Sequence, residues 1–164
     1  MKLENQYCTA EQSKELHRLG IRATAHKYWM RWDIPEAGNN FDLISKETLD
    51  ECEENPMVSP EAYPAWSVAE LLKALPFIIN HESNDYFMSF GHGSKGYRVI
   101  YETNKLGLIF NLDDELDREK KALFGTMRSG KYAAEVLAEY LRMLLDSNSN
   151  VIIVETLNER LNNA

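Results

Sequence analysis

The chain has 164 residues, of which 44% are hydrophobic and 27% are charged, and its formal net charge is −8. This composition excludes an intrinsically disordered chain, and no apolar run approaches the ~18 residues of a membrane span, so we expect one soluble, cytoplasmic domain over residues 1–164. Lys and Arg form no cluster of the kind that binds a phosphate backbone, which disfavours nucleic acid as a partner.

Residues 9–20 are predicted to form the first helix. Thr9 and Gln12 have the spacing of a capping box, in which the two residues satisfy each other's backbone N–H groups. Gly20 fits the position just after the helix, with the next residue folding back on Leu16 as in a Schellman motif.

Residues 25–34 are rich in aromatic side chains, end before Pro35 and are predicted to form a strand. Alternation places Trp29 and Arg31 on one face, and such a face can stack nucleobases. The acidic balance of the chain favours the simpler interpretation, a strand with both faces partly covered.

The negative charge is concentrated in an acidic, Pro-containing connection at about 36–64, where eight acidic residues face one base, Lys46. A short helix is predicted within it, capped by Ser45, with Leu49 and Cys52 turned inward. Such a charge run is compatible with a plain solvated surface, but long connections are often functional. The candidate residues for contact with a partner are Glu47, Asp50, Glu51, Glu53 and Glu54.

A second helix is predicted over residues 67–75. Ser67 and Glu70 form another capping box, and Trp66 precedes them at the position from which a hydrophobic staple reaches Leu71. Pro76 then ends the run.

Three alternating segments, 85–90, 97–102 and 106–111, predict an antiparallel meander with one buried face. Together with the helices, this sheet predicts an α+β fold with helices packed on one face of the sheet. The residues expected on the buried face are Tyr86, Met88, Phe90, Val99, Tyr101, Leu108 and Phe110.

In the remainder of the chain, residues 113–121 are expected to form an exposed helical turn and 131–146 a long amphipathic helix. The run VIIV at 151–154 is predicted to be a strand, followed by a short helix at 155–161.

The segment GHGSKG, residues 91–96, matches the G-x-G-x-x-G pattern of nucleotide-binding proteins. That pattern holds phosphates at the N-terminus of a helix, whereas a strand follows here, so we expect a hairpin turn instead. His92, Ser94 and Lys95 remain candidates for a small anion-binding loop, and His92 is the residue to test first for catalysis.

The sequence contains no recognisable catalytic or metal-binding arrangement. It has no G-x-S-x-G motif, its four histidines are scattered, and Cys8 and Cys52 are expected to be free thiols. We therefore predict no catalytic residue, no cofactor and no metal, while the oligomeric state stays open.

Three segments, CTAEQSKELHRLGI, YPAWSVAELLKALP and KYAAEVLAEYLRMLLD, resemble a set of short proteins encoded by phages, prophages and other mobile elements of Bacteroidetes-type bacteria. The resemblance implies an accessory role and brings no activity and no catalytic residues with it. Residues 151–164 depart from the pattern of that set.

Three functional hypotheses follow. The first is a non-enzymatic accessory protein of a mobile element that binds another protein through the acidic connection. The second is an acidic mimic of DNA that occupies a nucleic-acid-binding enzyme. The third is a small enzyme or an anion or nucleotide binder that uses the Gly91–Gly96 loop.

Overall fold

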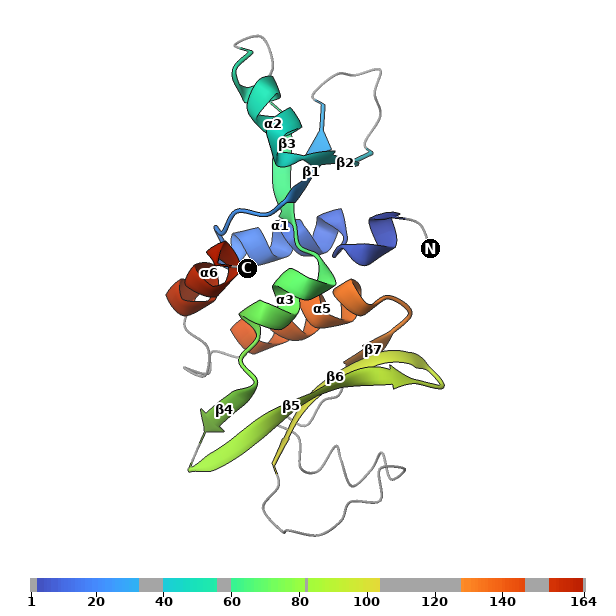
Figure 1. Ribbon diagram of the computed structural model, residues 1–164, viewed down its shortest axis with the longest axis vertical. Helices are drawn as coiled ribbons and strands as arrows, with labels where there is room; N and C mark the ends of the chain where they lie inside the picture. The colour runs from blue at the N-terminus through green and yellow to red at the C-terminus, as the bar shows by residue number, and fades with distance from the viewer. Residues whose placement is uncertain are drawn as a thin grey trace.

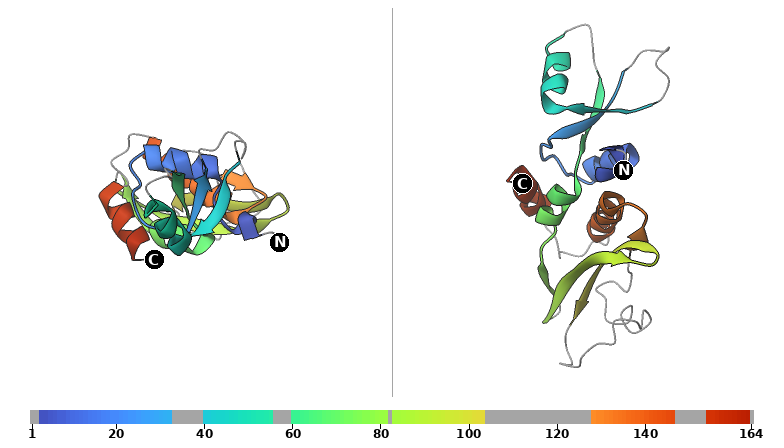
Figure 2. Two further views of the ribbon diagram at one scale, coloured as in Figure 1. Left: turned by 90° about the horizontal axis from the view of Figure 1, so that it is seen from above. Right: turned by 45° about the vertical axis from the view of Figure 1, so that its right-hand side comes forward.

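The computed structural model describes residues 3–32, 40–55, 60–81, 83–103, 128–146 and 154–163. In this part of the chain the elements form three layers, a small antiparallel sheet, a group of helices and a larger antiparallel sheet (Figures 1 and 2). The predicted α+β class with antiparallel strands is confirmed, although the strands are divided between two sheets.

The small sheet has β1 (Lys27–Arg31) in its centre, paired antiparallel with β2 (Asp42–Ser45) on one side and β3 (Glu61–Ala65) on the other. Only β1 was predicted from the sequence. Strand β3 was not predicted because it contains Pro64, and a proline has no N–H to donate to a neighbouring strand. The proline is tolerated because β3 is an outer strand of the described sheet.

Both faces of β1 are covered, as predicted. Trp29 packs with Ala10 and Ala65 on one face, and its Nε1–H donates to the Cys8 carbonyl oxygen at 2.7 Å. Tyr28 and Met30 belong to the main core on the other face. The aromatic strand is therefore part of the interior of the protein.

Helix α1 (Ala10–Arg18) has the ends that its sequence predicts. The Thr9 N–H donates to Gln12 Oε1 at 3.1 Å, and the Gln12 N–H donates to Thr9 Oγ1 at 3.2 Å. At the other end the Ile21 N–H donates to the Leu16 carbonyl at 3.0 Å, and Gly20 has a φ of +100°. This is the Schellman geometry, which a glycine adopts without strain.

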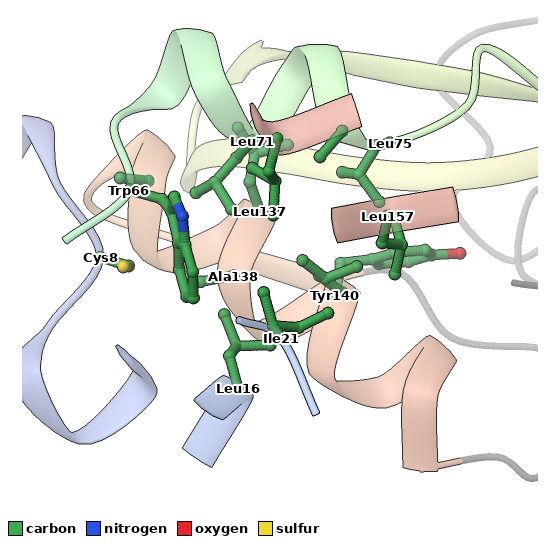
Figure 3. Close-up of a cluster of buried hydrophobic side chains, with 14 of the residues drawn as sticks. Cys8, Leu16, Ile21, Trp66, Leu71, Leu75, Leu137, Ala138, Tyr140 and Leu157 are labelled. Atoms are coloured by element: carbon green, nitrogen blue, oxygen red, sulfur yellow. The ribbon is translucent and has the colours of Figure 1, made fainter. Parts of the chain in front are cut away.

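Helix α3 (Val68–Ala74) begins at the predicted capping box of Ser67 and Glu70. Trp66, just before the cap, and Leu71, in the second turn, are both completely buried in the main core, as a hydrophobic staple requires (Figure 3). The Glu70 carboxylate also accepts from the His26 N–H at 3.3 Å, so the cap ties α3 to the segment before β1.

The larger sheet has the order β4–β5–β6–β7, with β4 spanning Ile78–His81, β5 Asn84–Gly93, β6 Gly96–Thr103 and β7 Arg128–Gly130. Strands β5 and β6 confirm the first two strands of the predicted meander. The third, 106–111, lies outside the described residues. Strands β4 and β7 were not predicted, because three or four residues give too short an alternation to recognise.

The predicted face of this sheet is confirmed by its register, but the face is not the only one that is buried, because Ile100 on the opposite side is 2% exposed. Phe90 pairs with Val99 and Met88 with Tyr101, and all four side chains contact the main core. The Tyr101 N–H donates to the Tyr140 hydroxyl at 3.2 Å, which fixes the sheet to the helical layer.

Helix α5 (Ala133–Asp146) fills the centre of the molecule between α1, α3 and the larger sheet. Its buried residues, drawn in part in Figure 3, are Ala134, Val136, Leu137, Ala138, Tyr140, Leu141 and Leu144. The amphipathic helix predicted over 131–146 is confirmed, although it begins at Ala133. The 3-10 helix η1 (Leu3–Gln6) lies beside α5.

Helix α6 (Val154–Asn162) corrects one prediction. Val154 was expected to end a strand but begins this helix, while 151–153 and the turn expected at 113–121 lie outside the described residues. Leu157 and Leu161, one helical turn apart, are both buried in the core. That packing outweighs the weak strand preference of a β-branched residue.

Within the described ranges, the helices are too short or too polar to cross a lipid bilayer.

Candidate interaction surface

Helix α2 (Lys46–Glu53) follows β2 directly and lies at the end of the molecule remote from the larger sheet (Figures 1 and 2). The Ser45 Oγ accepts from the Thr48 N–H at 3.2 Å and caps the helix as predicted. Leu49 is buried, and Cys52 is half-buried against the main core. These two residues hold the inner side of α2 on the small sheet.

The other sides of α2 carry acids. All five predicted interaction candidates are exposed: Glu47, Asp50, Glu51, Glu53 and Glu54. Four of them have the i, i+3, i+4, i+7 spacing that places side chains on one face of a helix. We call Glu47, Asp50, Glu51 and Glu54 the acidic stripe. It is about 10 Å long at 1.5 Å per residue and lies opposite Leu49.

The negative charge on α2 is compensated near the start of the helix but not at its end. Hydrogen bonds from its own backbone N–H and from Ser45 lower the pKa of Glu47, which lies in the first turn. Lys46 pairs with Asp50, and that hydrogen bond raises the pKa of Lys46. The last turn has no basic residue, although a helix C-terminus favours positive charge. The acids at the end of α2 therefore weaken the helix rather than stabilise it.

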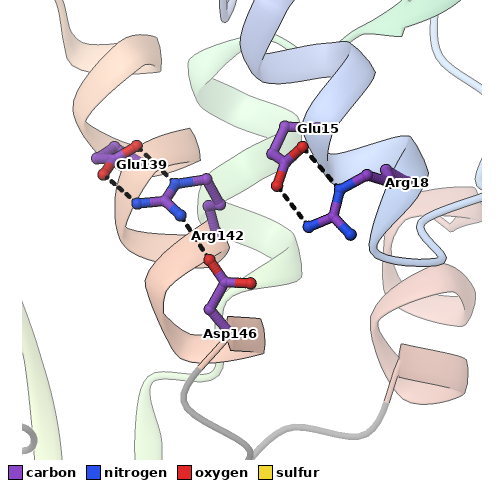
Figure 4. A network of polar contacts seen from close by, with 5 residues as sticks. All are labelled: Glu15, Arg18, Glu139, Arg142 and Asp146. Carbon is purple, nitrogen blue, oxygen red and sulfur yellow. Dashed lines mark hydrogen bonds and ion pairs between the residues drawn. The ribbon is translucent and has the colours of Figure 1, made fainter.

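A second charged group, on α1 and α5, differs because its members neutralise one another (Figure 4). Arg142 Nε and Nη2 contact the two carboxylate oxygens of Glu139 at 3.0 and 2.8 Å, and Arg142 also pairs with Asp146. Arg18 makes a similar two-point contact with Glu15, at 2.9 and 2.7 Å. Each of these pairs lies within a single helix, so the charges are neutralised separately on α1 and on α5.

The glycine segment 91–96 forms the predicted hairpin. Gly93 pairs with Gly96, the turn consists of Ser94 and Lys95, and Gly96 has a φ of +106°. Strand β6 starts at Gly96, so no helix N-terminus faces a phosphate here. His92, Ser94 and Lys95 are exposed, and the His92 ring lies edge-on to Tyr97 with ring centroids 4.9 Å apart.

A hollow of about 470 Å³ lies beside this hairpin, but the three loop candidates do not line it. Phe90 and Tyr97 form its aromatic wall, with stacked rings 6.1 Å apart. The other lining residues are Asn5, Gln6, Ser67, Val68, Ala69 and Ala133. The described lining residues include no Lys or Arg with which to hold a phosphate. Anion binding by the loop stays a prediction.

Both cysteines are free thiols, as expected. Cys8 is buried, and this burial raises its pKa to about 11. In the part of the chain that the structure describes, no three His, Cys, Asp or Glu side chains are close enough together to hold a metal ion.

No protein-family model, no curated protein and no solved structure matches this chain. The function has to be inferred from the surfaces that the fold presents, and α2 presents the strongest charge among those predicted from the sequence.

One polar cluster was missed by sequence reasoning. Glu61 on β3 binds Lys14 of α1 at 3.0 Å, accepts from the Tyr63 hydroxyl at 2.7 Å and pairs with Arg31 of β1. The Tyr63 and Lys14 hydrogen bonds lower the pKa of Glu61. The register of β3 with β1 brings these residues together, and that register cannot be inferred when β3 itself is not recognised.

Proposed function

We propose that this chain is a non-enzymatic accessory protein of a mobile element, that it works in the cytoplasm, and that it binds another protein through the acidic stripe of α2. One observation carries the proposal. A short helix at the end of the molecule exposes five acids, while its described contacts with the hydrophobic core come from Leu49 and Cys52. The resemblance to phage and prophage proteins supports an accessory role.

The chemistry of the stripe specifies its partner, which presents a basic surface. Charge complementarity of this kind accelerates association and makes it dependent on salt. Each exposed ion pair contributes about 0.2–1 kcal/mol, so a partner that pairs with several stripe acids gains specificity more than affinity.

A protein partner suits the stripe better than mimicry of DNA. Four charges over about 10 Å correspond to one charge per ~2.6 Å, compared with one per ~1.7 Å along duplex DNA. The stripe is also as long as only about three base pairs, which is short against the groove of a DNA-binding enzyme.

The test is a binding experiment with the partner that the wild-type chain captures from its own cell extract, repeated with both proteins purified. Glu51 and Glu54 are changed to Gln together, since neither side chain takes part in the Ser45 N-cap or in the Lys46–Asp50 pair. The matched control changes Glu155 and Glu159, which are exposed on α6, to Gln and alters the net charge equally.

We expect the α2 double variant to bind about two- to thirtyfold more weakly in calorimetry, and the α6 double variant to bind as wild type does. Binding that is unchanged by the α2 substitutions, or that does not weaken with added salt, would refute the proposal. Capture of a nuclease or restriction enzyme, released by competing DNA, would support mimicry instead.

A further inference from the structure

A hollow of about 270 Å³ lies on a different side of the small sheet from α2, where η1, the first turns of α1 and α5, β1 and the residues before β2 meet. It belongs neither to the acidic stripe nor to the hairpin loop. Its lining residues are Asn5, Tyr7, Thr9, Ala10, Glu11, Trp29, Asn40, Phe41 and Glu135.

Among the described residues, the charge of the lining is negative. Glu11 and Glu135 come from the first turns of two different helices, and the described lining residues include no Lys, Arg or His. The Gln12 Nε2–H donates to the Glu135 carbonyl oxygen at 2.9 Å, which holds the two turns together. The two carboxyl groups are thus brought to the same hollow by the packing of α1 on α5.

One of these carboxyl groups is partly withdrawn from water. Burial raises the pKa of Glu135, against the weaker opposite effect of Lys131. Neither Glu11 nor Glu135 forms an ion pair with a described residue. A positive ligand would relieve this desolvation.

Three aromatic residues from three segments complete the hollow. Trp29 is immobilised by its bond to the Cys8 carbonyl, and Tyr7 is held by a backbone bridge to Ser67. Phe41 already attracts a cation, since the Arg31 guanidinium lies 5.5 Å from the centroid of its ring. Aromatic rings beside carboxylates are the groups that bind organic cations in proteins.

The size of the hollow restricts the ligand. At about 270 Å³ it is slightly smaller than the ~300–1,000 Å³ of pockets for drug-sized molecules. It therefore suits a single side chain or a small amine rather than a nucleotide. The polar residues Asn5, Asn40 and Thr9 also line the hollow, next to the two glutamates.

We infer that this hollow binds an organic cation, an alkylammonium or guanidinium group, with Glu11 and Glu135 as its counter-ions and with Tyr7, Trp29 and Phe41 as its walls. The cation is either a Lys or Arg side chain presented by a protein or a free small amine. The site is independent of the acidic stripe.

The experiment titrates the full chain, followed by NMR, with four probes. These are Nα-acetyl-lysine methylamide, Nα-acetyl-arginine methylamide, free 1,5-diaminopentane, and the neutral isostere Nα-acetyl-norleucine methylamide. We expect the charged probes to shift the Trp29 indole N–H and the backbone N–H groups of Glu11 and Glu135 at millimolar concentration, and the neutral isostere to leave them unchanged.

Glu11→Gln combined with Glu135→Gln should weaken binding at least about tenfold, because each lost charge-assisted contact contributes more than a neutral one. Glu155→Gln with Glu159→Gln, and Glu51→Gln with Glu54→Gln, should leave binding intact. The second control distinguishes this site from the acidic stripe. The inference about the cation site and the proposal about the stripe can therefore be refuted independently.

Thermal unfolding checks that the double variant is folded, and Glu11→Gln alone, at an exposed position, serves if it is not. Tighter binding of the blocked amino acids indicates a protein-borne cation, and tighter binding of the diamine indicates a small amine. Absence of shifts with every charged probe, or equal shifts with the norleucine amide, overturns the inference.

Discussion

The backbone at Gly96 has a φ of +106°, and a Cβ placed there would collide with the carbonyl oxygen of Gly130 in β7. Gly96→Ala should therefore lower the free energy of unfolding by about 2 kcal/mol or more, through left-handed strain and this collision. Gly91→Ala is the matched control, since a Cβ there meets nothing within 4 Å, and we expect a change below about 1 kcal/mol. Chemical denaturation measures both, and equal costs would show that the turn does not require its glycine.

Because the Cys8 thiol is buried, we expect the free energy of unfolding to fall as the pH rises into the alkaline range. Its folded pKa is about 11 against an ordinary value of 9.0, so the unfolded chain releases this proton first. The contribution of this thiol to the free energy of unfolding is fully present below pH 9. It is lost as the pH rises toward 11, and the total loss is about 1–3 kcal/mol. Denaturation at several pH values should show this decline, and Cys8→Ala should reduce it. An identical decline in the variant would assign it to other groups.

Asn158 makes three of the hydrogen bonds that attach helix α6 to the segment after α1. Asn158 Oδ1 accepts from the N–H groups of Arg22 and Ala23 at 2.6 and 3.0 Å, and its Nδ2–H donates to the Gly20 carbonyl at 3.1 Å. Asn158→Ala leaves three backbone groups without this partner and should cost about 1–3 kcal/mol. Asn163→Ala, at an exposed position just after the same helix, should cost almost nothing. Thermal unfolding compares the two, and hydrogen exchange shows whether the amides of α6 open first.

Elements with local signals were predictable, and elements that depend on distant partners were not. The Thr9 and Ser67 capping boxes locate α1 and α3 because both halves of each box lie within four residues. Strand β3 carries Pro64 and becomes a strand only by pairing with β1, more than thirty residues earlier. Val154 was misassigned because its own preference is for a strand, whereas the contacts that decide its structure come from the rest of the fold.

The candidate surface followed the same division. The Ser45 cap and the helical spacing of Leu49 and Cys52 among acidic residues were enough to predict α2 and its exposed acids. The hollow between Glu11 and Glu135 was not predictable, because these residues are 124 positions apart and meet only through the packing of α1 on α5.

At the scale of the whole molecule, the described residues of α2 gather negative charge at one end, and we expect that charge to cost stability. Glu51 and Glu54 repel each other and their neighbours Glu47 and Asp50 at i, i+3 and i, i+4 spacings, and Glu54 lies at the helix C-terminus. Glu51→Gln with Glu54→Gln should therefore raise the free energy of unfolding by about 0.5–1 kcal/mol at low salt. Added salt should stabilise the wild type more than the variant. Destabilisation of the variant at low salt would show that these acids support the fold.

The order of the three layers is also determined by contacts between residues that are far apart in the sequence. Tyr140 on α5 meets the Tyr101 backbone of the larger sheet, and the Glu70 cap meets the segment before β1. Residue patterns within either segment predict a buried tyrosine and a capped helix, and therefore the α+β class. They contain nothing that selects which sheet lies on which side of the helices.

The attachment of α6 has a consequence for synthesis on the ribosome. Backbone N–H groups of the segment that follows α1 donate to Asn158, 136 positions later, and Leu157 and Leu161 close the interior beside it. A nascent chain that has emerged only as far as α5 therefore leaves this segment and α3 facing solvent where α6 will lie. We expect stalled chains without 154–163 to be cut rapidly by proteases near Gly20, and chains released with this segment to resist.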